Sequence, residues 1–116
     1  MTAVTSLDDD VFVVRLNSQQ VEVYDAVNFT LQRHITVPGL GRRAYGMIAC
    51  VRNKCLYLSD CDKSNVHRVE LSDSNAMKKW SVASGPAGLS VNIAHNLVVT
   101  CREANKLQEY TTHGQM

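Results

Sequence analysis

Short apolar runs separated by polar turns recur along the whole chain. The runs are rich in Val, Leu and Tyr, which favour strands, and turn-forming residues such as Asp8-Asp9-Asp10 stand between them. No stretch beyond about eight residues has the periodicity of a helix. The pattern therefore predicts an all-β chain in which no helix is longer than one or two turns.

The apolar runs fall into three groups of expected strands. The first group covers residues 3–7, 11–16, 20–24 and 31–37. The second group covers residues 46–51, 55–59, 65–71 and 77–83, and the third covers 89–93, 97–101 and 106–111. The second strand of each group is apolar at nearly every position, which is typical of a strand covered on both faces. The fourth strands carry charge at Arg33, Lys78 and Lys79, which is typical of an exposed sheet edge.

The three groups are copies of one repeat. Residues 10–24 and 96–110 align without a gap at an offset of 86, and a middle copy at 54–60 lies 44 residues after the first and 42 before the third. Four strands in roughly 43 residues is the signature of one β-propeller blade. The sequence therefore predicts a single domain of four-stranded antiparallel meanders: blade 1 at 1–41, blade 2 at 42–86, and blade 3 at 87–116 without its outer strand.

The blade pattern resembles the NHL-repeat β-propellers. Pro86-Ala87-Gly88-Leu89-Ser90-Val91 matches the motif that opens the family's blade, and Leu56-Tyr57-Leu58-Ser59-Asp60 matches its apolar strand closing on Asp. The third copy departs from the family, because Arg102 or Glu103 stands where that Asp would be. The resemblance implies about 2.7 NHL-like blades, each with its first strand nearest the propeller axis.

The chain is shorter than a complete ring of such blades. It has 116 residues, whereas six blades need about 258 at roughly 43 residues each. Repeat units cannot bury their apolar faces alone, so we expect a partial propeller completed by self-assembly, as a homodimer that closes a six-bladed ring. The expected assembly interface is Ala3, Thr5, Val13, Val21, Leu89, Val91, Val99 and Leu107.

Charge and cysteine content narrow the function classes only a little. Lys and Arg number 12 against 11 Asp and Glu, so bulk charge gives no reason to expect nucleic acid or a membrane surface as partner. The spacing of the four cysteines selects no disulfide pairing, and free buried thiols are the favoured interpretation over a hairpin bridge between Cys50 and Cys55. Together with a start unlike a signal peptide, this favours a cytoplasmic location.

Propeller ligands usually bind to the loops between blades and between second and third strands. In this chain those loops bring basic and aromatic residues toward one rim, which comprises Arg42, Arg43, Tyr45, Lys63, Arg102 and Lys106. The favoured interpretation is a non-enzymatic binding or scaffold module that presents the rim to a protein or peptide. The resemblance to NHL domains of the TRIM-like class makes RNA an alternative partner, since cations and an aromatic ring suit single strands.

The sequence gives little support to catalysis or metal binding. His34, His67, His95 and His113 share no spacing, and Asp8-Asp9-Asp10 lacks the alternating oxygen ligands of a calcium loop. A metal-dependent lyase of the NHL class would need His ligands in the propeller channel, and His67 is the best-placed candidate for that second alternative. We expect no cofactor, no metal and no enzymatic activity.

Overall fold

The computed structural model describes residues 2–44, 46–72 and 75–116, which form three antiparallel sheets. Blade 1 consists of β1 (Thr2–Leu7), β2 (Asp10–Arg15), β3 (Gln20–Asp25) and β4 (Leu31–Thr36). Blade 2 consists of β5 (Gly46–Cys50), β6 (Cys55–Asp60), β7 (Asn65–Glu70) and β8 (Met77–Ser81). Blade 3 consists of β9 (Pro86–Val91), β10 (Leu97–Cys101) and β11 (Lys106–Tyr110).

The strands confirm the all-β prediction and the order of each meander. Neighbours in sequence pair in every sheet, and none of the described residues lies in a helix that could span a membrane. The largest difference from the expected bounds is at β9, which begins at Pro86 rather than at residue 89. The outer strands β4 and β8 are exposed at Arg33, Lys78 and Lys79, as edge strands should be.

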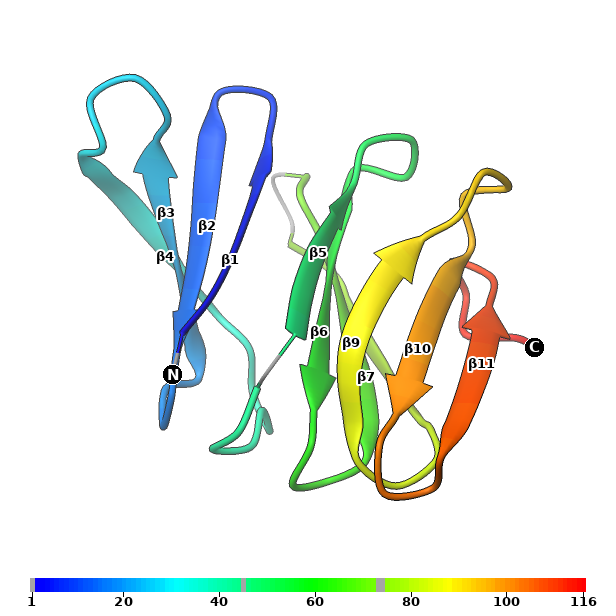
Figure 1. Cartoon of the computed structure of the whole chain (residues 1–116). Coiled ribbons are helices and arrows are strands. Elements are labelled where there is room, and N and C mark those ends of the chain that lie inside the picture. The colour runs from blue at the N-terminus through cyan, green and yellow to red at the C-terminus, as the bar shows by residue number, and fades with distance from the viewer. Residues whose placement is uncertain (1, 45, 73–74) are drawn as a thin grey trace.

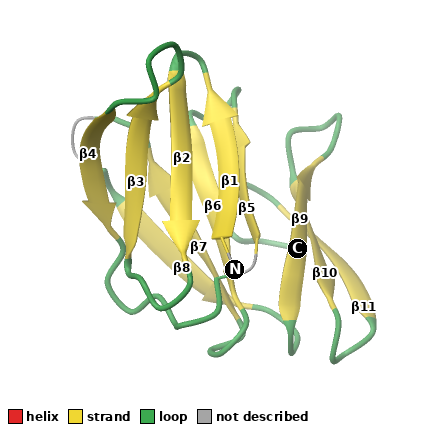
Figure 2. Cartoon of the chain, turned by 60° about the vertical axis from the view of Figure 1, so that its left-hand side comes forward, coloured by secondary structure: helices red, strands yellow, loops and turns green. Residues whose placement is uncertain are grey.

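The three sheets fan out around a common axis, with β1, β5 and β9 on the inside (Figure 1). Inner strands of neighbouring blades contact one another, β1 with β5 and β5 with β9. The outer strands β4 and β8 lie farthest from the axis, and blade 1 covers one side of blade 2 while blade 3 covers the other (Figure 2).

Two separate hydrophobic cores fill the spaces between the blades. The first core lies between blades 1 and 2 and includes Phe12 and Val14 of β2 with Leu56 and Leu58 of β6. The second core lies between blades 2 and 3 and includes Tyr57 of β6. All six residues of β6 are buried, because successive side chains point into the two cores in turn. This confirms that the second strand of blade 2 is covered on both faces.

The structure shifts the alignment of the repeats by one residue. The turn from second to third strand has four residues in every blade, which makes Arg15, Asp60 and Cys101 equivalent at separations of 45 and 41. The sequence alignment gave 44 and 42. The difference arises in the preceding turn, which has two residues in blade 1 but four in blade 2. A shift of one residue moves every side chain to the opposite face of a strand.

The expected assembly interface also needs correction, because its residues come from both faces of their strands. Ala3 and Val21 belong to the first core, and Thr5 accepts a hydrogen bond from the amide of Ala49 at 3.3 Å, so all three face blade 2. The residues Leu89, Val91 and Val99 pack into or against the second core, which again lies inside the chain.

Two of the eight expected interface residues lie on the open faces of the outer blades. Val13 shares the open face of blade 1 with Val4, its partner in β1. Leu107 shares the open face of blade 3 with its partner Thr100 and with Val98, two residues from Thr100 on β10. Side chains directly opposite in an antiparallel pair lie on the same face of the sheet, which fixes this assignment.

Candidate binding rim

The expected ligand loops meet at one edge of the molecule, the lower edge in Figure 1. Backbone hydrogen bonds join several of them. The amide of Asn17 donates to the carbonyl of Arg42 at 3.0 Å, and the amide of Cys61 donates to the carbonyl of Arg43 at 3.1 Å. In blade 3 the amide of Arg102 donates to the carbonyl of Gly85 at 2.9 Å. The turns of blades 1 and 2 are therefore tied to the linker between these blades, and the turn of blade 3 is tied to the loop that precedes β9.

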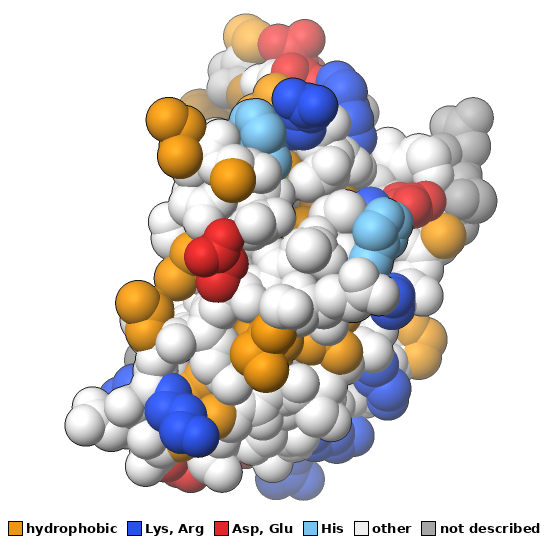
Figure 3. Space-filling model, turned by 90° about the vertical axis from the view of Figure 1, so that its right-hand side faces the viewer, with side chains coloured by type: hydrophobic (Ala, Val, Ile, Leu, Met, Phe, Trp, Pro, Cys, Tyr) orange, Lys and Arg blue, Asp and Glu red, His pale blue; other side chains and the backbone are white. Residues whose placement is uncertain are grey.

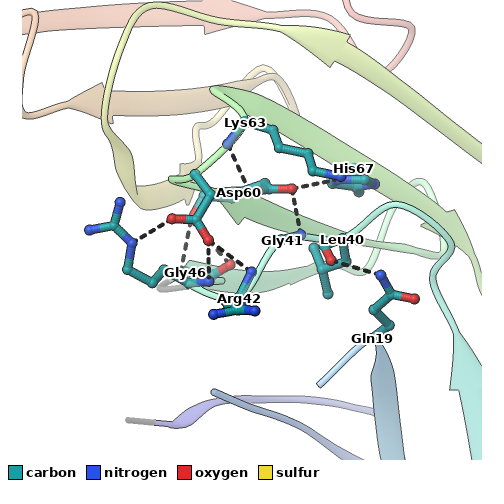
Figure 4. A network of polar contacts seen from close by, with 11 residues as sticks. Gln19, Leu40, Gly41, Arg42, Gly46, Asp60, Lys63 and His67 are labelled. Atoms are coloured by element: carbon teal, nitrogen blue, oxygen red, sulfur yellow. Dashed lines mark hydrogen bonds and ion pairs between the residues drawn. The ribbon is translucent and has the colours of Figure 1, made fainter. Parts of the chain in front are cut away.

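A buried carboxylate anchors the linker between blades 1 and 2 (Figure 4). Asp60 is fully buried at the end of β6, and its Oδ2 accepts a hydrogen bond from the amide of Gly41 at 2.7 Å. Its Oδ1 accepts from the amide of Lys63 at 3.2 Å, and Oδ2 also lies 3.4 Å from Nε2 of His67. A Cβ on Gly41 would collide with this carboxylate, so the linker can approach only as glycine.

A second, more exposed carboxylate orients the basic part of the linker. Asp62 Oδ2 accepts from the amides of Arg42 and Arg43 at 2.9 and 3.1 Å, and its Oδ1 accepts from Arg43 Nε at 2.5 Å. The hydrogen bond from the Arg43 guanidinium lowers the pKa of Asp62, so this carboxylate stays ionised at neutral pH. Asp62 therefore partly balances the charge of Arg43 and holds its guanidinium in place.

Between blades 2 and 3 the rim contains a hollow of about 400 Å³. It is lined by Arg43, Cys61, Gly85, Arg102 and Glu103. Gly85 has a φ of +75°, and a Cβ there would come within 2.8 Å of the backbone nitrogen of Glu103. Two guanidinium groups beside one carboxylate suit a polar ligand group that accepts hydrogen bonds, such as a carboxylate or an amide oxygen.

The structure brings together part of the predicted rim. Arg43 and Arg102 line the hollow, while Lys106 lines a neighbouring hollow of about 370 Å³ that also touches Arg102. Arg42 and Lys63 lie on the same edge, held through their backbone amides by Asp62 and Asp60 respectively. Tyr45, the aromatic member of the predicted rim, lies outside the described residues.

Three lining residues were not among the predicted rim residues. Cys61 and Glu103 belong to the turns that follow the second strands of blades 2 and 3, and Gly85 directly precedes β9. Their positions relative to the strands were visible in the sequence. A rim defined by basic and aromatic side chains leaves all three out, since Cys61 and Gly85 are uncharged and Glu103 is acidic.

The described residues contain no cluster of three or more His, Cys, Asp and Glu side chains that could hold a metal ion. His67 lies in β7, buried beside Asp60, and burial lowers its pKa so that the ring is neutral at physiological pH. Its ring is therefore part of the anchor of the linker. The inner strands that face the axis are β1, β5 and β9, and His67 is on none of them.

Solved structures of similar shape identify the architecture. The chain superimposes on hydrazine synthase of Kuenenia stuttgartiensis with a TM-score of 0.73 and 17% identity, covering 85% of this chain and 28% of that one. Catalytically inactive virginiamycin B lyase of Staphylococcus aureus, solved with quinupristin, gives 0.71 and 11% over 94% of this chain and 40% of the lyase. The chain has a β-propeller fold.

Glutaminyl cyclase of Myxococcus xanthus, with a TM-score of 0.67 and 12% identity over 93% of this chain and 46% of the cyclase, agrees with this architecture. The chain thus spans less than half the length of these three propeller proteins. Identities this low carry the fold and nothing about activity. No protein-family model matches the chain, and no curated protein sequence matches it, so membership of the NHL family stays a prediction.

Proposed function

We propose that the chain is a non-enzymatic binding module of the β-propeller type whose rim binds an acidic segment of a protein or peptide. The observation that carries the proposal is the hollow between blades 2 and 3, where Arg43 and Arg102 flank an open space of about 400 Å³. An arginine side chain presents a planar fork of donors that matches a carboxylate.

The surroundings of the hollow favour an anionic ligand. Arg42, Lys63 and Lys106 add exposed positive charge along the same rim, against the negative charge of Asp62 and Glu103. Among the described residues, no hydrogen bond or ion pair engages the guanidinium of Arg102. A ligand carboxylate can therefore pair with it without displacing an existing partner.

The test is fluorescence anisotropy with three labelled probes: an oligoglutamate peptide, an oligolysine peptide and an oligouridine RNA. We expect the oligoglutamate to bind and the oligolysine not to bind. Arg102→Ala should weaken oligoglutamate binding about tenfold, which corresponds to about 1.4 kcal/mol. The matched control is Arg33→Ala, which removes an exposed cation from β4 at the far side of blade 1.

Two outcomes would overturn the proposal. One is oligoglutamate binding that is the same in Arg102→Ala as in wild type. The other is oligouridine binding that is tighter than oligoglutamate binding and falls steeply with salt, which would replace the peptide with RNA as the partner. The metal-dependent lyase alternative gains no support from the position of His67.

Self-assembly into a ring is a second part of the proposed function. Val4 on the open face of blade 1 is 62% exposed and Leu107 on the open face of blade 3 is 70% exposed, whereas both faces of blade 2 are covered by its neighbours. Head-to-tail packing of blade 1 of one copy on blade 3 of another would cover both. Sedimentation should then detect a species of twice 12.9 kDa, and a purely monomeric chain at micromolar concentration would overturn this part.

A further inference from the structure

A small hollow lies between the end of β4 in blade 1 and the outer strands of blade 2. Its volume is about 230 Å³, and it is lined by Val37, Pro38, His67, Met77, Lys78 and Lys79. None of these residues lines the hollow of the rim. Blades 1 and 2 both have four strands, so the hollow lies between two complete blades.

His67 is the buried polar side chain of this hollow. It is 3% exposed, and its partner across the β7–β8 pair is Lys79, so the two side chains lie on the same face of blade 2. Val69, two residues along β7, belongs to the first core. Alternation along the strand therefore turns His67 and Lys79 toward blade 1.

One ring nitrogen of His67 is bound within the chain and the other is not. Nε2 lies 3.4 Å from Oδ2 of Asp60 (Figure 4). A carboxylate only accepts hydrogen bonds, so the neutral ring carries its proton on Nε2 and presents Nδ1 as an acceptor. Among the described residues no group donates to Nδ1. Trp80 Nε1 is the one fully buried side-chain nitrogen without a partner there, so Nδ1 of His67 keeps contact with the open space of the hollow.

At the equivalent position of the other blades the side-chain acceptor has a partner within the chain. Glu22 stands there in blade 1, and its carboxylate accepts a hydrogen bond from Arg15 Nε at 3.0 Å. Gln108 stands there in blade 3, and its Oε1 accepts from the hydroxyl of Tyr110 at 2.9 Å. The fold itself therefore does not require an open acceptor at this position. In blade 2 a donor on a ligand would supply the missing partner.

The surroundings of the ring are positively charged. Burial is the main cause of the lowered pKa of His67, and the charges of Lys79 and Lys63 lower it further. A Cβ on Gly39, whose φ is +81°, would lie 3.3 Å from Nζ of Lys79, so this ammonium group lies against the turn that follows Pro38. No acidic side chain of the described residues forms an ion pair with Lys79. An anionic group of a ligand can therefore pair with it.

Apolar side chains form the rest of the lining. Val37 is buried, and Pro38 and Met77 are exposed beside it. An apolar cavity of about 150 Å³ holds a benzene ring, so a hollow of about 230 Å³ has room for one ring with short substituents. On the side of blade 3, in contrast, the hydrophobic side chains visible in Figure 3 are scattered among polar atoms.

We propose that the hollow binds a small phenolic carboxylic acid. The hydroxyl donates a hydrogen bond to Nδ1 of the buried His67, and the carboxylate pairs with the exposed Lys79. The aromatic ring packs against the apolar lining between them. A few polar contacts that orient an otherwise apolar ligand are typical of small-molecule sites. The site is separate from the rim that carries the proposed function.

The test is isothermal titration calorimetry with 4-hydroxyphenylacetate as the probe. Phenylacetate lacks the hydroxyl group, and tyramine carries an ammonium group in place of the carboxylate. We expect the probe to bind and each of these two compounds to bind at least about tenfold more weakly. The nitrogen resonance of His67 Nδ1 should shift when the probe binds, because Nδ1 then accepts a hydrogen bond, and it should not shift with phenylacetate.

A charge reversal tests the second contact. Lys79→Glu should weaken binding of the probe at least about tenfold and strengthen binding of tyramine. The matched control is Lys106→Glu, which makes the same change at an exposed lysine of blade 3 and should leave both affinities as in wild type. Arg102→Ala should also bind the probe as wild type does, because Arg102 belongs to the rim.

Four outcomes would overturn the proposal. Two are failure of the probe to bind at millimolar concentration and binding of phenylacetate as tight as that of the probe. A third is binding of the probe without a shift of the His67 resonance. The fourth is equally tight binding of N-acetyltyrosine amide, which would assign the hollow to a tyrosine side chain of a protein in place of a free acid.

Discussion

The carboxylate of Asp60 and the imidazole of His67, on neighbouring strands of blade 2, lie 3.4 Å apart with both side chains buried. Asp60 also accepts the amides of Gly41 and Lys63. One carboxylate therefore ties β7, the β6–β7 turn and the linker from blade 1 to a single point, which explains why a charged group is retained in the interior.

Replacing this carboxylate should destabilise the fold. Asp60→Ala leaves the amides of Gly41 and Lys63 without their acceptor in a buried site, and we expect the free energy of unfolding to fall by about 3 kcal/mol. Urea denaturation followed by circular dichroism measures it. Asp9→Ala, in the exposed turn between β1 and β2, is the control and should change stability by no more than about 0.5 kcal/mol. Equal effects of the two substitutions would contradict the anchoring role.

The stability of the fold should depend on pH through His67. Burial lowers its pKa in the folded chain, with Lys63 and Lys79 acting in the same direction and Asp60 against them. The unfolded chain therefore binds more protons just below its own pKa of about 6.5, so the free energy of unfolding falls as pH decreases through that value. His67→Gln should flatten this part of the profile. His34→Gln, on the exposed β4, is the matched control, and a profile unchanged by His67→Gln would refute the assignment.

Replacement by alanine should destabilise the fold at one glycine of the inner strands much more than at another. A Cβ on Gly46 would collide with the backbone carbonyl of Ala87 in the next blade, whereas a Cβ on Gly88 would meet only the side-chain hydroxyl of Thr100. The backbone of Ala87 cannot move aside without separating β5 from β9. We therefore expect Gly46→Ala to lower the free energy of unfolding by about 2 kcal/mol or more. Gly88→Ala should cost less than half of that. Thermal unfolding of the two variants side by side distinguishes them.

Cys61 should be the thiol that reacts first. It is partly exposed in the hollow of the rim, while Cys50, Cys55 and Cys101 are buried, and burial raises the pKa of Cys55 and Cys101. Iodoacetamide followed by peptide mass analysis should show one fast site, which Cys61→Ser removes. Alkylation should also weaken oligoglutamate binding, because the added group fills the hollow. Fast modification of Cys55 in the folded chain would contradict the burial described here.

The corrected faces of blade 1 predict different behaviour for two valines. Val13→Asp places a charge on the open face, so the chain should stay folded while any assembly through that face is lost. Val21→Asp places the same charge in the first core, where an unpaired buried carboxylate should unfold the chain. Sedimentation together with circular dichroism separates the two outcomes. Unfolding of both variants would argue against the assignment of faces.

The sequence predicted the blades well because each depends on local features. Turn residues and strand length repeat at nearly constant spacing, and the charges of Arg33, Lys78 and Lys79 mark the outer strands. The rim loops followed from the strand order. The strand order did not show which face of a blade each side chain occupies. Residues 11–14 of β2 are apolar at every position, so the alternation that would assign side chains to one face or the other is absent there. The hollow depends on contacts such as that of Arg43 with Asp62, which join residues of separate loops.

The division of the interior at β6 has a consequence for how the molecule comes apart. Leu56 and Leu58 serve one core and Tyr57 the other, so the two interfaces between blades contribute separately to stability. Blade 3 can detach while blades 1 and 2 remain a folded pair, and blade 1 can detach while blades 2 and 3 remain. Blade 2 cannot unfold while its neighbours stay packed, because its unfolding removes both interfaces between blades at once. The middle of the chain is therefore the part on which cooperative folding depends.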